Sequence, residues 1–408
     1  MSAPEKPDLV LGFTPLTDCA PLIVALEHGH FERYGLRVAL SCEPSWANIR
    51  DKLAAGVLDG AQMLAPMPIA STLGVGPLHQ AMVTALSLGL NGNTITVSTE
   101  LARSMAEADP QAMATVSGRA RALARVVAER SDIGAARLRF ASVFPVSMHA
   151  YHLRRWFASA GLRAERDLRL VVQSPVRMVA ELEAGAIDGF CVGEPWGSLA
   201  VARGSGSSLL ATHELWNCAP EKVLGVRLDF AERHPETHLA LVCALLEAAR
   251  WCDAHENRPK LARMLADGGF VRAPASVLAL SESHVFHRYA ANFPWRSHAI
   301  WIIAEMLRWG QIEKPLDVRT AAASVYRTDL AREAASRLGL AVPQADEKRE
   351  GTHAEPWQAA GTTGPITLGP DLFFDGSVFD PGDPVGYLAR CEVSDLRFPL
   401  EELEALQA

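Results

Sequence analysis

The stretch LAAGVLDG at residues 53–60 recurs as LEAGAIDG at residues 182–189, with Leu, Gly, Asp and Gly in the same places and no gap. Each copy stands near the end of a unit that runs strand, helix, strand, helix, strand; the first unit begins near residue 9 and the second near residue 138. Strands that alternate with crossover helices predict an α/β lobe. The repeat is too long for a solenoid, so the chain is predicted to contain one module twice.

Two such lobes are expected to face each other across a ligand cleft, because ligands of these sheets bind beyond the carboxyl ends of the strands. We therefore predict a two-lobed α/β fold with parallel-type sheets. The predicted divisions are lobe 1 at residues 8–95, lobe 2 with a preceding helical linker at residues 96–225, a helical region returning toward lobe 1 at residues 226–342, and an extended C-terminal segment at residues 343–408.

Composition excludes several classes of protein. The net charge is −8 and the charges are interspersed, which opposes direct binding to nucleic acid. No apolar stretch is long enough to span a membrane. The seven cysteines are odd in number and form no Cys-x-x-Cys pair, so neither a disulfide framework nor a zinc site is indicated. The first residues have no leader-like pattern, which predicts a cytoplasmic protein with reduced thiols.

The usual catalytic motifs are missing from the sequence: Gly-x-Ser-x-Gly, His-Glu-x-x-His, the P-loop and a Gly-x-Gly-x-x-Gly turn. His149 and His152 lie three apart on one predicted helix and could share a metal, but no cysteine or carboxylate motif accompanies them. We therefore expect a binding protein without a cofactor or metal, and not an enzyme.

Two candidate donors lie in the first unit. Trp46 stands at a loop–helix junction and offers one indole N–H; the alternative is an ordinary core or interlobe aromatic residue. Asn93 closes Asn91-Gly92-Asn93 after an apolar strand, where the alternative is a simple turn. Its amide would donate to an oxyanion.

Two further candidates lie in the second unit. His149 opens a helix after Phe144-Pro145; it is either a capping or surface histidine or a donor in the cleft, where an anion would favour its protonated form. Lys222 lies where a proline-containing loop enters an apolar strand. It is either a solvated lysine or the charge that balances a bound monoanion.

Four motifs, at residues 16–22, 43–52, 63–68 and 193–196, resemble the nitrate/bicarbonate-binding proteins of bacterial ABC importers. The likeness runs from about residue 8 to residue 310. It implies the two-lobed periplasmic-binding-protein fold of the second type, in agreement with the duplication.

The resemblance implies that Trp46, Asn93, His149 and Lys222 hold the anion and that Pro175 lines the pocket. Glu194, from the last motif, is expected in the same cleft. Bicarbonate-binding members carry an acidic residue at the position of Lys222, so this lysine favours nitrate or nitrite. The family amide is usually glutamine, and the shorter Asn93 leaves the preference between nitrate and nitrite open.

Because no leader is recognised, the chain is most similar to the cytoplasmic nitrate/nitrite sensors of the NasS type. That resemblance implies a signalling role in nitrate assimilation, in which ligand binding releases an RNA-binding antiterminator of the response-regulator type. Two alternatives remain: the binding subunit of a nitrate or related anion importer, and an enzyme on the same fold. The pyrimidine-forming proteins of thiamine biosynthesis are such enzymes, but this chain lacks their cysteine-rich motif.

Overall fold

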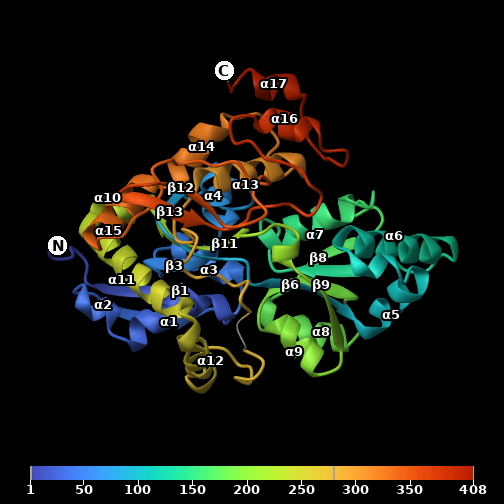
Figure 1. Cartoon of the computed structure of the whole chain (residues 1–408), viewed down its shortest axis with the longest axis horizontal. Helices are drawn as coiled ribbons and strands as arrows, with labels where there is room; N and C mark the ends of the chain where they lie inside the picture. The colour runs from blue at the N-terminus through green and yellow to red at the C-terminus, as the bar shows by residue number, and fades with distance from the viewer. Residues whose placement is uncertain (1, 279–280, 408) are drawn as a thin grey trace.

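Lobe 1 contains a mixed sheet in which three parallel strands are followed by one antiparallel strand, and two short strands pair antiparallel with that one. The computed structural model describes residues 2–278 and 281–407, and shows two lobes side by side (Figure 1). The strand order in lobe 1 is β2-β1-β3-β11-β4, with β5 also paired to β11. The strands are β1 (Asp8–Phe13), β2 (Arg37–Cys42), β3 (Gly60–Leu64), β4 (Met82–Val83), β5 (Ser87–Leu90) and β11 (Pro220–Arg227).

Lobe 2 repeats this arrangement with its own sheet, in the order β10-β6-β9-β7-β8. Its strands are β6 (Asn93–Ser98), β7 (Arg139–Ser142), β8 (Arg169–Val172), β9 (Gly189–Gly193) and β10 (Gly206–Ala211). Strands β7, β8 and β9 run parallel, as β1, β2 and β3 do in lobe 1.

The repeated sequence motif has the same structural role in both lobes. Gly56 and Gly185 follow a helix with φ of +75° and +65°, the left-handed region that glycine adopts without strain. The Asp59 carboxylate accepts from Val10 N of β1 at 2.9 Å, and Asp188 accepts from Arg139 N of β7 at 2.7 Å. Each motif therefore ends a helix and fixes the next strand beside the first strand of its lobe.

The sheets are mixed rather than parallel throughout. Strand β11 runs antiparallel to β3 in lobe 1, and β6 runs antiparallel to β9 in lobe 2. The lobes thus exchange strands: Asn93, placed in lobe 1 by the sequence boundaries, begins a strand of the second sheet, and Lys222 belongs to the first. An antiparallel strand continues its sheet without a crossover helix, so the strand–helix alternation on which the boundaries rested could not reveal the exchange.

The chain crosses between the lobes at two adjacent segments. The first contains Asn91 and Gly92, both with positive φ, and the second leads through Ala219 into β11. Asn91 N donates to Ala219 O at 2.9 Å, and Ala219 N donates to Asn91 Oδ1 at 3.0 Å. The Asn-Gly pair is therefore a crossing between two lobes, hydrogen-bonded to the returning chain.

Helices cover both sheets (Figure 1). In lobe 1 they are α1 (Ala20–Glu27), α2 (His30–Arg33), α3 (Trp46–Ala54) and α4 (Pro66–Leu73). In lobe 2 they are α5 (Thr99–Ala108), α6 (Val116–Asp132), α7 (Met148–Ala158), α8 (Met178–Glu183) and α9 (Trp196–Ala202). After β11, α10 (Leu228–Arg233), α11 (Pro235–Asp253) and α12 (Arg258–Asp267) return to lobe 1, where α11 packs against α1.

The last part of the chain lies over both lobes. It contains α13 (Arg296–Arg308), α14 (Val318–Val325), α15 (Thr328–Arg337), the hairpin β12 (Trp357–Gly361) and β13 (Gly364–Leu368), α16 (Pro384–Ala389) and α17 (Leu400–Glu404). Helix α13 contacts α4 of lobe 1. In lobe 2, the Tyr151 hydroxyl of α7 donates to Gln311, which follows α13, at 2.8 Å.

The segment from residue 343 onward is expected to be extended, yet it is firmly packed in places. Glu350 and Asp371 are fully buried, and the Phe373 ring lies 4.8 Å from the Trp216 ring of lobe 2. Arg155 of α7 donates to both carboxylate oxygens of Asp375 at 3.0 Å. This segment therefore fastens the C-terminal region to lobe 2.

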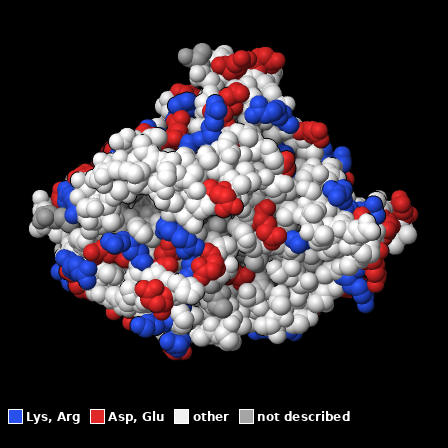
Figure 2. Space-filling view, viewed as in Figure 1, with Lys and Arg blue, Asp and Glu red and all other residues white. Residues whose placement is uncertain are grey.

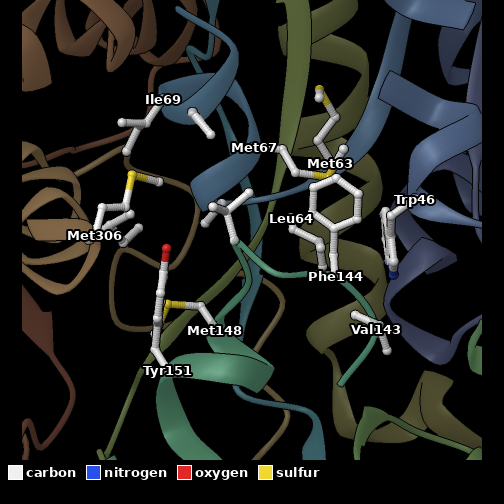
Figure 3. Packing of buried hydrophobic residues seen from close by; sticks show 14 of the residues in the cluster. Trp46, Met63, Leu64, Met67, Ile69, Val143, Phe144, Met148, Tyr151 and Met306 are labelled. Carbon is white, nitrogen blue, oxygen red and sulfur yellow. The ribbon is translucent and has the colours of Figure 1, made fainter. Parts of the chain in front are cut away.

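One apolar cluster joins the lobes at their interface. Figure 3 shows Trp46, Met63 and Leu64 of lobe 1 facing Val143 and Phe144 of lobe 2, all of them buried. Burial of apolar surface favours association by roughly 25 cal/mol per Å², so this cluster favours close approach of the lobes.

Acidic and basic side chains are interspersed on the face shown in Figure 2, in agreement with the charge pattern of the sequence. None of the helices within residues 2–278 and 281–407 has the length and apolar character needed to cross a bilayer.

Candidate functional site

The four predicted donors lie at or near the first residue of four elements that begin at the interface between the lobes. Trp46 is the first residue of α3, and His149 is the second residue of α7. Each helix begins at a serine whose hydroxyl accepts a backbone N–H of the first turn, which fixes where the following side chain points. Asn93 begins β6 and Lys222 lies near the start of β11.

Lys222 is the centre of the site. Its side chain is only 1% exposed, and its ammonium lies 2.6 Å from Glu221 Oε1 and 2.8 Å from Asp18 Oδ2. Burial opposes the charge, but the two carboxylates outweigh it and raise the pKa of Lys222. The predicted cation is therefore present and buried, but it already has two anionic partners.

Asn93 and His149 meet the same carboxylate. The Asn93 amide donates to Glu221 Oε2 at 2.5 Å, and His149 Nε2 lies 3.6 Å from Glu221 Oε1. Burial, together with the charge of Lys222, lowers the pKa of His149 well below its usual value. The neutral imidazole is therefore favoured in the chain without ligand, and it can donate one N–H.

Trp46 completes the group. Its side chain is fully buried, and its ring lies 5.5 Å from the Lys222 ammonium, within the range of a cation–π contact. Across the described residues, Trp46 Nε1 has no hydrogen-bond partner. An unpaired buried N–H costs about 1–3 kcal/mol, so this donor is available to a ligand placed beside it.

Asp18 and Gln62 form a second layer behind Lys222. Gln62 Nε2 donates to Asp18 Oδ1 at 2.5 Å, while Gln62 Oε1 accepts from Thr14 N at 2.9 Å. All three residues are buried. This chain of hydrogen bonds fixes the Asp18 carboxylate, which in turn positions the Lys222 ammonium.

Asp18 lies in the motif at residues 16–22, but sequence reasoning assigned no role to Asp18, Gln62 or Glu221. Neighbouring residues of a strand normally point to opposite faces, so Glu221 is not expected beside Lys222. The register of β11 against β5 shifts on both sides of Lys222, and this irregularity lets both side chains reach the site. The signal in the sequence that could have indicated Glu221 is its position next to Lys222 in an otherwise apolar strand.

Pro175 and Glu194 are the two other predicted site residues, and within the described residues neither has a hydrogen bond or ion pair with a side chain of this group. Pro175 is buried at the start of the short 3-10 helix Pro175–Arg177, and the preceding Ser174 donates to Pro44 O beside α3. Glu194 accepts from Ser198 N of α9 at 3.1 Å, and its backbone oxygen accepts from Thr17 N at 2.8 Å. Ser174 and Glu194 therefore join the two lobes, and the Glu194 carboxylate accepts an N–H in the first turn of α9.

This group of side chains comes from both lobes. It combines one buried cation, a side-chain amide, an imidazole and an indole N–H with two buried carboxylates, Glu221 and Asp18. Within the described parts of the chain, no group of three or more His, Cys, Asp or Glu residues could hold a metal ion. The fold and this group together define a two-lobed periplasmic-binding-protein-like protein.

Comparison with known proteins identifies the family. Residues 2–266 match the family described as NMT1-like. The chain is 38% identical to the nitrate import ATP-binding protein NrtC of Synechocystis, over 95% of this chain and 55% of that protein. It is 32% identical to the nitrate/nitrite binding protein NrtA of Synechococcus elongatus, over 95% of this chain and 86% of that protein.

A solved structure shows the same architecture. The periplasmic nitrate-binding protein NrtA from Synechocystis superposes with a TM-score of 0.83 at 28% identity, covering 96% of this chain and all of that one. The chain belongs to the NMT1-like family and, within it, to the nitrate/bicarbonate-binding proteins related to ABC importers. It spans about half the length of several curated relatives that it matches. The names of these relatives describe binding and import proteins.

Proposed function

We propose that this chain binds nitrate or nitrite between its lobes and acts as a sensor whose occupancy controls an RNA-binding antiterminator partner. The observation that supports the ligand is Lys222, a cation that is 1% exposed and lies 2.6 Å from Glu221, the carboxylate that Asn93 and His149 of lobe 2 also contact. Bicarbonate-binding members of the family carry an acidic residue at this position, so by resemblance the lysine favours nitrate or nitrite over bicarbonate.

The energetics allow physiological affinity. Binding at about 1 μM requires roughly −8 kcal/mol. Hydrogen bonds to a charged group contribute about 1.5–3 kcal/mol each. Three or four donors from Trp46, Asn93, His149 and Lys222 supply this free energy only when Lys222 and Asn93 are released from the carboxylates that they contact in the free chain.

The division of donors supports the signalling step. Trp46 and Lys222 lie on elements of lobe 1, whereas Asn93 and His149 lie on elements of lobe 2. A ligand held by both lobes binds best when they are close together, and so shifts the population toward that state. A partner that binds only separated lobes would be released by linkage. The acidic chain, with a net charge of −8, leaves RNA contact to that partner.

The ligand is tested by calorimetric titration with nitrate, nitrite, bicarbonate and chloride at fixed ionic strength. We expect micromolar affinity for nitrate or nitrite, reduced at least tenfold in Lys222→Ala. Lys52→Ala is a matched control, because Lys52 also pairs with a buried carboxylate, Glu43, at 2.6 Å but lies outside the donor group. Unchanged nitrate affinity in a folded Lys222→Ala protein would mean that the site is elsewhere.

The second candidate function is the binding subunit of an importer for nitrate or a related anion, which the names of the relatives favour. The two functions are separated by isolating the chain from the cells that produce it, with and without nitrate. An RNA-binding protein that co-purifies only without nitrate supports the sensor. Nitrate-dependent stimulation of an ABC transporter's ATPase, with no such partner, supports the importer subunit.

A further inference from the structure

The Glu221 carboxylate already engages the donors that the ligand is expected to use. It accepts from Lys222 Nζ at 2.6 Å and from Asn93 Nδ2 at 2.5 Å, and it lies 3.6 Å from His149 Nε2. The side chain is 2% exposed and cannot turn to bulk water without moving its neighbours. A carboxylate is a small planar oxyanion, as are nitrate, nitrite and bicarbonate. Glu221 therefore has the shape and charge of the proposed ligand.

The site already contains two carboxylates beside one ammonium, so a bound anion would be a third negative group. Facing Glu221 are Asp18 before α1, Lys222 on its own strand, His149 on α7 and Cys191 on β9. His149 is neutral for the reasons given above, and burial raises the pKa of the Cys191 thiol well above its usual value. With both carboxylates ionised, Lys222 alone faces two negative charges. A bound monoanion would add a third in a buried site, where unpaired charge is strongly disfavoured.

We propose that Glu221 is an internal competitor for the anion and that nitrate or nitrite binds together with one proton, which neutralises the Glu221 carboxylate. The inference rests on the proposed anion-binding function. In this step the anion enters, a proton from solvent joins a Glu221 oxygen, and no covalent bond of the ligand changes. The protonated carboxyl then releases the Lys222 ammonium and the Asn93 amide to the ligand, and its O–H becomes a further donor.

Glu221 is suited to take up this proton. Burial raises its pKa, although Lys222 and Asn93 oppose that shift. Replacement of its negative charge by that of a ligand held by the same donors keeps the total charge of the site constant. Affinity should then depend on pH in a defined way: once Glu221 is fully ionised in the free protein, each further pH unit weakens binding tenfold.

The test is calorimetric titration of the full chain with nitrate at pH 6.5, 7.5 and 8.5, each in phosphate and in Tris. The two buffers have different enthalpies of ionisation, so the difference in observed heat gives the number of protons taken up. We expect uptake to approach one proton at pH 8.5, with affinity falling by up to tenfold per pH unit. In Glu221→Gln, which keeps the shape but not the charge, we expect no uptake and an affinity independent of pH.

Glu43→Gln is the matched control, because Glu43 is a buried glutamate paired with a lysine but has no part in the donor group. It should retain the proton uptake of the native chain. Nitrate binding by the native chain with no proton exchange and a flat pH profile would overturn the inference and leave the proposed function standing. Binding that requires a divalent cation and is abolished by EDTA would also overturn it. Failure of nitrate and nitrite to bind at every pH would contradict both this inference and the proposed function.

Discussion

Replacement of Trp46 by phenylalanine is expected to weaken nitrate binding while leaving the fold almost unaffected. Trp46 is fully buried, and its indole N–H has no partner among residues 2–278 and 281–407. Phenylalanine keeps a flat ring against Lys222 but removes this one donor. The substitution therefore isolates a single hydrogen bond to the ligand.

The magnitudes for affinity and stability differ. Loss of one hydrogen bond to a charged ligand reduces the binding free energy by about 1.5–3 kcal/mol, which makes the dissociation constant roughly 10- to 150-fold larger. Stability experiences two opposing effects. Removal of the unpaired N–H recovers about 1–3 kcal/mol, whereas the smaller ring leaves a cavity that costs on the order of 1–2 kcal/mol. The free energy of unfolding should then change by less than about 2 kcal/mol.

The assays are nitrate titration by calorimetry and urea unfolding without ligand. Trp156→Phe is the matched control, since Trp156 is also fully buried but donates to Val116 O at 3.1 Å within lobe 2. That control should lose stability and keep its nitrate affinity, the reverse of Trp46→Phe. If Trp46→Phe binds nitrate within twofold of the native chain, the indole does not contact the ligand and the assignment of Trp46 is wrong.

Two further predictions concern the rest of the chain. Burial lowers the pKa of His152 and His284 to about 3 and of His238 to about 4. The same histidines take up protons near pH 6.5 in the unfolded chain, so the free energy of unfolding is highest above that pH and decreases below it. Each histidine should cost about 2 kcal/mol at pH 5, and His152→Phe should show a smaller difference between urea unfolding at pH 7 and pH 5; an equal difference would contradict this. Arg155→Ala should lower the free energy of unfolding by about 1–3 kcal/mol and expose residues 370–380 to limited proteolysis, because it removes the ion pair to Asp375 and the contact 4.0 Å above the Phe373 ring. The control Arg166→Ala, which removes an ion pair of an exposed arginine with Asp167, should change neither quantity. An unchanged cleavage pattern in Arg155→Ala would show that other contacts hold the segment.

The duplicated motif predicted the two-lobed architecture correctly because its residues have a local role. The carboxylates of Asp59 and Asp188 accept the N–H of a neighbouring strand, so the pattern and the structure are directly linked. The exchange of β6 and β11 was not predictable in this way. Antiparallel pairing with a strand far along the chain leaves no periodic trace in the sequence.

The site was predictable to the extent that its residues stand at the ends of elements. Trp46 and His149 follow capping serines, and Asn93 and Lys222 stand near strand starts, all positions that a strand–helix reading can locate. The carboxylates were missed because their role depends on tertiary contacts. Asp18 lies beside Lys222 only because β11 joins the sheet of lobe 1. Glu221 lies beside it only because the register of β11 against β5 is irregular at Lys222.

The two crossings between the lobes lead directly into strands that carry Asn93 and Lys222, and Asn91 and Ala219 hydrogen-bond these crossings to each other. The hinge segments about which the lobes would rotate therefore lie next to the residues that would bind the anion. A mutational scan of this protein should therefore find no separate classes of hinge and pocket variants. Any substitution that alters the angle between the lobes in the free protein will also alter ligand affinity, and selection for a new ligand will alter the equilibrium between open and closed lobes.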